Sequence, residues 1–152
     1  MRLSFAAAAA VCTLAVGCSG DNQDGISFAR VSGRITINGE PAPGIEVSFN
    51  PIMEDGALLS GPVSSARTDT EGRYTLITTS GKSRPAAVVG RHDVVLQTVT
   101  TYTVTEETGA VDAERLSKFA FPPEAGVFEF TVPPGGTDAA DFNVENAAVE
   151  GP

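Results

Sequence analysis

The side chains that could perform chemistry in this chain are few, and their spacing does not assemble a reactive group. The sequence has one histidine, His92, and two cysteines, Cys12 and Cys18, near its start. A hydrolytic triad needs a nucleophile, a base held by a hydrogen bond and an orienting acid. Because His92 lies beside the apolar residues of a predicted strand, we expect it to have a structural role. The sequence therefore predicts a protein that is not an enzyme.

Acidic pairs in loops raise the question of a metal ion. Zinc takes three or four His, Cys or acidic ligands, and the histidines and cysteines for such a set are missing. Asp69 with Glu71, or Glu54 with Asp55, could offer oxygens to calcium. However, the ligand series of an EF-hand is absent, and acidic turns are commonly just solvated. We expect no metal and no cofactor.

Cys18 ends a segment with the layout of an export signal. Arg2 supplies a positive start, residues 3–16 form an apolar stretch too short to span a bilayer comfortably, and small residues follow. The sequence Leu14-Ala-Val-Gly-Cys18 resembles the lipobox of bacterial lipoproteins, in which a cysteine after small residues is lipidated and becomes the new N-terminus. The resemblance implies that Cys18 carries the lipid. The alternatives are an ordinary secretory signal that leaves Cys18 as a free thiol, and a transmembrane anchor.

Composition and charge argue against several binding partners and against covalent crosslinks within the domain. The formal net charge of -9 repels nucleic acid and anionic lipid head groups. Since both cysteines lie near the start, the domain can contain no internal disulfide and must be held by its core. The only lysines, Lys82 and Lys118, fall in predicted loops, which disfavours an isopeptide crosslink to asparagine.

Apolar residues alternate with polar residues in several short segments, and this period of two is typical of half-buried strands. Asn38-Gly39 follows the first segment and predicts a chain reversal, so we expect the first two segments to pair as a hairpin. Residues 92–99 are apolar on both faces, which predicts a central strand. The predicted strands cover residues 31–37, 45–50, 63–68, 73–76, 92–99, 128–132 and 142–144.

Seven strands separated by Gly and Pro turns, with no convincing amphipathic helix, predict an all-β protein. We expect an antiparallel Greek-key β-sandwich, with a closed barrel as the alternative. Residues 106–121 are predicted as a loop, although residues 106–117 could form one irregular helical turn. The predicted organisation is a signal peptide at 1–17, a flexible tether at 18–27, the sandwich at 28–146 and a frayed tail at 147–152.

Three segments, residues 31–49, 66–76 and 89–96, carry turn and strand motifs in a characteristic order. Together they resemble the carboxypeptidase regulatory-like domain, a transthyretin-like (prealbumin-like) sandwich; the second contains Thr68-Asp-Thr-Glu-Gly-Arg-Tyr74, similar to that family's T-D-x-x-G-x-[FY] turn. The chain also resembles the short single-domain lipoproteins common in Planctomycetes. This resemblance implies a fold and a cellular location more than it implies an activity. The related hydrolases of urate breakdown need several histidines and a C-terminal Tyr-Arg-Gly-Ser segment, whereas this chain ends Val149-Glu-Gly-Pro152.

These observations predict a lipid-anchored protein of the cell envelope, at the outer membrane or the periplasmic face. Its expected partners are the membrane, through the lipid, and an envelope protein or a glycan, with no nucleic acid. Loops at 51–61 and 106–123 are the expected recognition surface. One alternative is a carbohydrate-binding module, which favours exposed aromatic rings; here Tyr74 is expected in the core, and Tyr102 is the other tyrosine. Another is a hydrolase that uses His92.

Overall fold

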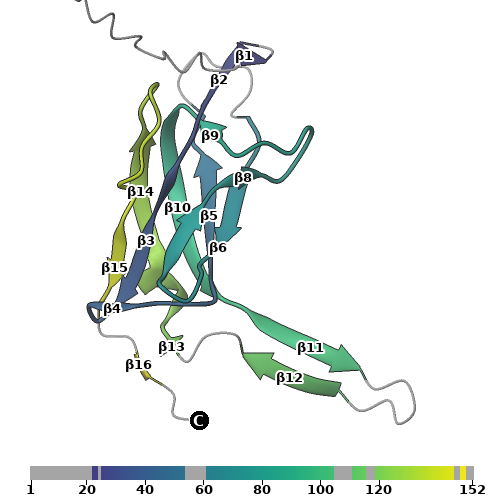
Figure 1. The fold of residues 1–152 in the computed structure, drawn as a ribbon, viewed down its shortest axis with the longest axis vertical. Helices are drawn as coiled ribbons and strands as arrows, with labels where there is room; N and C mark the ends of the chain where they lie inside the picture. Colours follow the sequence, from purple (N-terminus) through teal and green to yellow (C-terminus); the bar gives the residue numbers. More distant parts are fainter. Residues whose placement is uncertain are drawn as a thin grey trace, which may run out of the picture.

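The computed structural model describes residues 22–23, 25–53, 61–104, 111–115, 119–145 and 148–149. Over these ranges the chain consists of strands, turns and one short 3-10 helix, η1 (Pro123–Gly126), with no α-helix (Figure 1). No helix in the described ranges is long and apolar enough to cross a membrane. The prediction of an all-β protein with antiparallel sheets is confirmed.

The larger sheet has five antiparallel strands in the order β14-β10-β5-β6-β8. β10 lies between β5 and β14, which confirms the prediction of a central strand. On β5 the buried Ile45, Val47 and Phe49 alternate with less buried residues, because successive side chains of a strand point to opposite faces. The five strands are β5 (Ile45–Pro51), β6 (Ser64–Arg67), β8 (Ile77–Thr78), β10 (Gly90–Thr98) and β14 (Val127–Val132).

The smaller sheet is built around β3. Its strands are β3 (Ser32–Ile37), β4 (Glu40–Pro41), β7 (Arg73–Thr75) and β15 (Phe142–Val144). β4 and β7 pair antiparallel with β3, whereas β15 pairs parallel with it and places Phe142 opposite Ile35. A parallel pair cannot be joined by a tight turn. The neighbour of β3 on this side is therefore β15, a strand about 100 residues later in the chain. The prediction of wholly antiparallel pairing is therefore wrong at this edge.

The predicted first hairpin is correct at its turn and wrong beyond it. Asn38 and Gly39 both have positive φ, 52° and 83°, as a two-residue hairpin turn requires, and β3 pairs with β4 across them. The chain then crosses to the larger sheet, where β5 pairs with β6 and β10. Thr68 fixes this crossing, because its hydroxyl donates to the Ala42 carbonyl (2.6 Å) and accepts the Ile45 N–H (2.9 Å).

A projecting hairpin occupies part of the segment predicted as a loop at 106–121. β11 (Thr100–Val104) pairs with β12 (Val111–Arg115), and together they extend from one end of the body (Figure 1). β13 (Phe119–Ala120) follows and pairs with β16 (Ala148–Val149), inside the tail predicted to fray. The loop prediction is wrong for β12, because the β-branched residues of β11 favour pairing with an extended segment that returns beside them. It is also wrong for β13, whose partner β16 lies far along the chain.

Pairing also begins earlier than expected at the N-terminal end. β1 (Asn22–Gln23) pairs with β2 (Ile26–Ala29), and both begin inside the segment predicted as a tether at 18–27. β2 pairs in turn with β9 (Ala87–Val88). Ile26 packs against a small buried cluster of Phe28, Ala86 and Val88, and this burial explains why the chain is held in place here.

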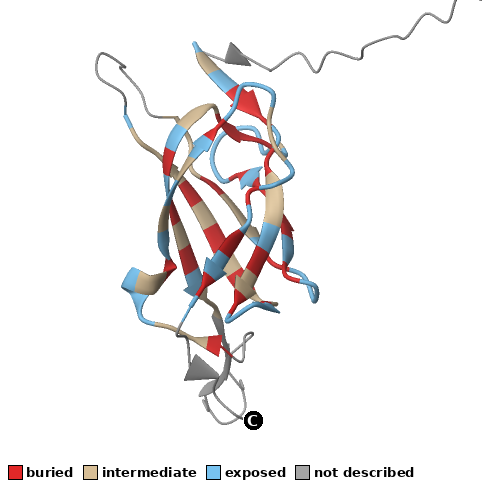
Figure 2. Ribbon diagram, turned by 90° about the vertical axis from the view of Figure 1, so that its left-hand side faces the viewer, coloured by how far each residue is buried: buried red, intermediate tan, exposed pale blue. Residues whose placement is uncertain are grey.

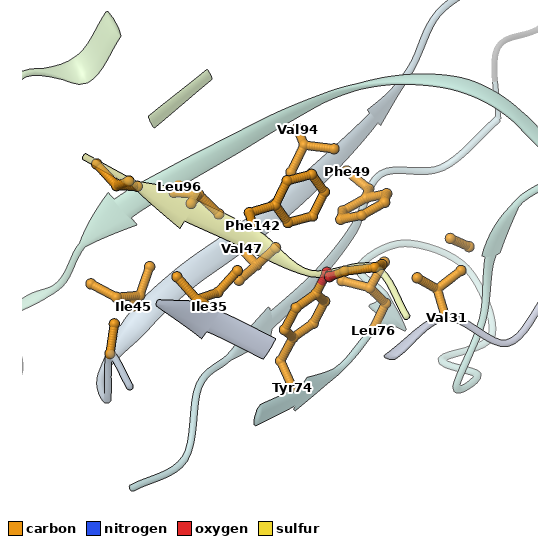
Figure 3. Packing of buried hydrophobic residues seen from close by; sticks show 14 of the residues in the cluster. Val31, Ile35, Ile45, Val47, Phe49, Tyr74, Leu76, Val94, Leu96 and Phe142 are labelled. Atoms are coloured by element: carbon orange, nitrogen blue, oxygen red, sulfur yellow. The ribbon is translucent and has the colours of Figure 1, made fainter. Parts of the chain in front are cut away.

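One core lies between the two sheets, and both sheets contribute side chains to it (Figure 3). Buried and exposed residues alternate along the strands around it (Figure 2). Tyr74 is 4% exposed, which confirms its predicted place in the core. The main contributors are Ile35, Ile37, Val47, Phe49, Tyr74, Leu76, Val94, Leu96, Val132, Phe142 and Val144.

Candidate functional site

Several of the residues singled out by the sequence lie outside the described ranges. These are Cys18, Glu54, Asp55 and Lys118; the side chain of Tyr102 is likewise not described. The predicted lipidation of Cys18 and a calcium site at Glu54 and Asp55 therefore stay predictions. Lys82 is exposed in the loop after β8.

His92 lies on the core face of β10 and is 1% exposed. Its Nδ1 lies 3.0 Å from the Gly90 carbonyl oxygen, so Nδ1 carries the proton in the neutral ring and Nε2 carries the lone pair. Nε2 is buried without a hydrogen-bond partner, and the ring contacts Phe49 at a centroid distance of 5.6 Å. Burial lowers the pKa of His92, against a smaller raising effect of the bond to Gly90. In this conformation the ring cannot contact a substrate.

Asp69 and Glu71 are both engaged in the turn before β7. The Asp69 carboxylate accepts the backbone N–H of Arg73 (2.9 Å) and that of Glu71 (2.8 Å). These bonds, with the one from Arg73 largest, lower the pKa of Asp69 against the opposing effect of desolvation. Glu71 forms an ion pair with the Arg73 guanidinium. The described ranges hold no group of three or more His, Cys, Asp or Glu side chains placed to bind a metal ion.

An open cleft lies over β3 and β7 on the smaller sheet. Its volume is about 400 Å³, and its lining combines positive and negative charges with hydroxyl groups. Three segments far apart in the sequence contribute to it: the start of β3, the whole of β7 and the turn before β15. The lining residues are Ser32, Gly33, Arg34, Arg73, Tyr74, Thr75, Asp138 and Asp141.

Register places two arginines side by side in this cleft. Arg34 on β3 is directly opposite Arg73 on β7. The Ile35 N–H donates to the Gly72 carbonyl (2.8 Å) and the Leu76 N–H to the Val31 carbonyl (3.0 Å), so these two positions of the ladder are of the hydrogen-bonded type. Because hydrogen-bonded and non-hydrogen-bonded pairs alternate in an antiparallel ladder, Arg34 and Arg73 form a non-hydrogen-bonded pair, the type in which side chains lie closest. Like charges directly opposite are destabilising in a sheet.

The opposite wall of the cleft is acidic and is set by a close backbone crossing. A Cβ atom on Gly33 would lie 2.0 Å from the carbonyl oxygen of Ala140, so only glycine lets the chain pass there. The Tyr74 hydroxyl donates to that same oxygen (2.7 Å), and burial, with a smaller contribution from Asp141, raises the pKa of Tyr74. The Asp141 carboxylate in turn accepts the backbone N–H of Arg34 (2.7 Å). These contacts hold the turn that carries Asp138 beside β3.

Sequence reasoning missed this cleft. The period of two places Arg34 and Arg73 at polar positions of predicted strands, and Asp138 and Asp141 fall between the predicted strands at 128–132 and 142–144. What joins them is the parallel pairing of β15 with β3, which alternation of apolar residues does not reveal. One usable signal was present, since Gly33 interrupts a strand pattern and such a glycine often marks a close backbone approach.

Comparison of the chain with protein families, with curated proteins and with solved structures gave no match.

Proposed function

We propose that this chain is a lipid-anchored protein of the cell envelope whose β domain binds a partner and performs no catalysis. The observation that carries the proposal is that the N-terminal strands and the projecting hairpin lie at opposite ends of the domain. β1 and β2 lie at one end of the molecule, and the β11–β12 hairpin projects from the other end (Figure 1). An anchor attached just before β1 would therefore leave the hairpin end facing away from the membrane.

The distance from the anchor to the domain is short in this proposal. Asn22, the first residue of β1, follows Cys18 by four residues. Because an extended chain spans at most about 3.3–3.6 Å per residue, the lipidated cysteine lies within about 14 Å of β1. The domain would be held close to the membrane, at the outer membrane or the periplasmic face, and its N-terminal end would face the lipid.

The proposal includes a transthyretin-like sandwich. Two observations support it: the seven predicted strands are all present, and the Asp69 turn leads directly into β7 and the buried Tyr74, as the family's turn motif implies. The burial of His92 supports a non-catalytic role. The burial of Tyr74 removes one of the two tyrosines that a carbohydrate platform could have used.

The test is the intact mass of the protein extracted from membranes of a bacterium that lipidates exported proteins. We expect a chain that starts at Cys18 and carries a diacylglyceryl increment. Cys18→Ala should lose the increment and leave the membrane fraction, whereas Cys12→Ala, inside the removed segment, should match the wild type. An unmodified chain in the aqueous fraction would show that Cys18 is a free thiol of a secreted protein and would overturn the proposal.

A further inference from the structure

The cleft over β3 and β7 has separated charges. Arg34 and Arg73 lie on adjacent strands at one side, and Asp138 and Asp141 lie on the segment that borders the other side of β3. Arg34 is exposed, and its guanidinium forms no ion pair within the described ranges although two carboxylates line the same cleft. A cation in this position is available to a ligand.

Two features of the arginine side favour recognition of a carboxylate. Arg34 and Arg73 form a close cross-strand pair. Arg73 also forms an ion pair with Glu71, but its side chain is 58% exposed, so both guanidinium groups can converge on one anionic group of a ligand. Ser32 and Thr75 form the neighbouring pair on the same face, and their hydroxyls can donate to the same anion.

The carboxylates on the acidic side of the cleft argue against a ligand that carries only negative charge. Asp138 is exposed, and one carboxylate oxygen of Asp141 accepts the backbone N–H of Arg34, which leaves the other oxygen for a ligand. With a formal net charge of -9, the whole chain also repels a ligand that carries only negative charge. A ligand that brings an ammonium group to these carboxylates meets both requirements.

We propose that this cleft binds a ligand carrying both a carboxylate and an ammonium group, with the carboxylate at Arg34 and Arg73 and the ammonium at Asp138 and Asp141. The turn that carries Asp138 and Asp141 lies directly beside β3, so about one strand spacing, about 4.8 Å, separates its backbone from that of Arg34, and Arg73 on β7 lies one strand further away. This separation suits the termini of a very short peptide or the two charged groups of an amino acid. The inference rests on the proposed function, because it names the class of partner that the envelope domain recognises.

The experiment titrates the mature lipidated chain, which starts at Cys18, in detergent micelles with glycine, diglycine and triglycine while amide NMR shifts are recorded. N-acetyl-diglycine, which lacks the ammonium, and diglycine amide, which lacks the carboxylate, are titrated in parallel. The variants are Arg34→Gln and Asp138→Asn. Arg67→Gln is the matched control, because Arg67 is an exposed arginine on β6 of the other sheet and lies outside the cleft.

We expect at least one zwitterion to shift signals of residues lining the cleft, and the strongest binder of the series reports whether an amino acid or a peptide is preferred. Arg34→Gln should weaken that binding at least about tenfold, which is the contribution of one hydrogen bond to a charged group. Asp138→Asn should weaken it less, and Arg67→Gln should leave it unchanged. Equal binding of the acetylated peptide, equal binding by Arg34→Gln, or no binding by any zwitterion overturns the inference. Since the mass of the same sample shows the lipid independently, failure here does not count as failure of the anchor.

Discussion

The interactions that hold the strands together differ between the two sheets of this protein. In the larger sheet, residues 92–98 of β10 pair with β5 on one side, and residues 90–95 pair with β14 on the other. In the smaller sheet the strands are short, and single side chains complete the pairing. Asn143, for example, accepts the Gly39 N–H (3.2 Å) and the Thr36 hydroxyl (2.9 Å) through one oxygen.

This difference shows where the fold depends on a pattern and where it depends on individual residues. A ladder of apolar alternation is spread over many positions, so a conservative change at one of them leaves the rest in register. The smaller sheet instead depends on a glycine at the crossing and a tyrosine hydroxyl beneath it, and its connection to the larger sheet depends on a threonine that follows β6. We expect the largest effects of small substitutions there.

Gly33→Ala should be the most damaging of these changes. Its Cβ would lie 2.0 Å from the Ala140 carbonyl oxygen, and the nearest atoms are backbone, which cannot rotate away. We expect a loss of about 4 kcal/mol or more in the free energy of unfolding, or failure to fold, measured by thermal and urea denaturation.

Gly135→Ala is the matched control for that variant. Nothing lies within 4 Å of a Cβ built on Gly135, so the same added methyl group should change stability by less than about 1 kcal/mol. Equal stability of the two variants would mean that the crossing beside β3 can open without cost, and the proposed contrast between the sheets would fail.

Thr68→Val should rank second. This variant keeps the shape of the side chain but removes both bonds of the hydroxyl, leaving the Ile45 N–H and the Ala42 carbonyl buried without that partner. We expect a loss of about 2–3 kcal/mol in urea denaturation, since each unsatisfied buried group costs about 1–3 kcal/mol. Thr68→Ser keeps the hydroxyl and should cost less than half as much; a similar loss in both variants would assign the effect to packing alone.

The contrast between the sheets also explains what the sequence could predict. Alternation of apolar residues over five or more positions is a strong signal and predicts β5 and β14, and a short run that is apolar on both faces predicts β10. The turn at Asn38-Gly39 was predicted because its backbone needs residues that tolerate positive φ. Both kinds of inference use only neighbouring residues.

What could not be predicted depends on pairs that are distant in sequence. Alternation places Ile35 and Phe142 on buried faces, but it does not say that their strands lie parallel and adjacent. Strands of two residues, such as β13 and β16, are too short for any period to be visible. The cleft was missed for the same reason, because Arg34 becomes a neighbour of Asp141 only through the parallel pairing.

His92 is a polar residue on the buried face of β10 in the larger sheet. Its titration gives the smallest expected effect on stability and a direct test of the contrast between the two sheets. The pKa of His92 is lowered in the folded chain from the usual value of 6.5, because the ring is buried. As the pH falls below about 6.5, the unfolded chain therefore binds a proton that the folded chain does not, and the free energy of unfolding decreases. The slope is at most about 1.4 kcal/mol per pH unit, until the folded pKa is reached.

His92→Leu should remove this contribution while leaving the ladder of β10 intact. Urea denaturation of both proteins, from about pH 7.5 to about pH 5, should give curves that diverge as the pH falls, by about 1 kcal/mol in favour of the variant. The carboxylates titrate in both proteins and cancel in the difference, and no other histidine is present. Parallel curves would mean that Nε2 reaches water or a partner on protonation. In that case the larger sheet opens locally at His92. The stability of the larger sheet would then depend on a single side chain, as that of the smaller sheet does.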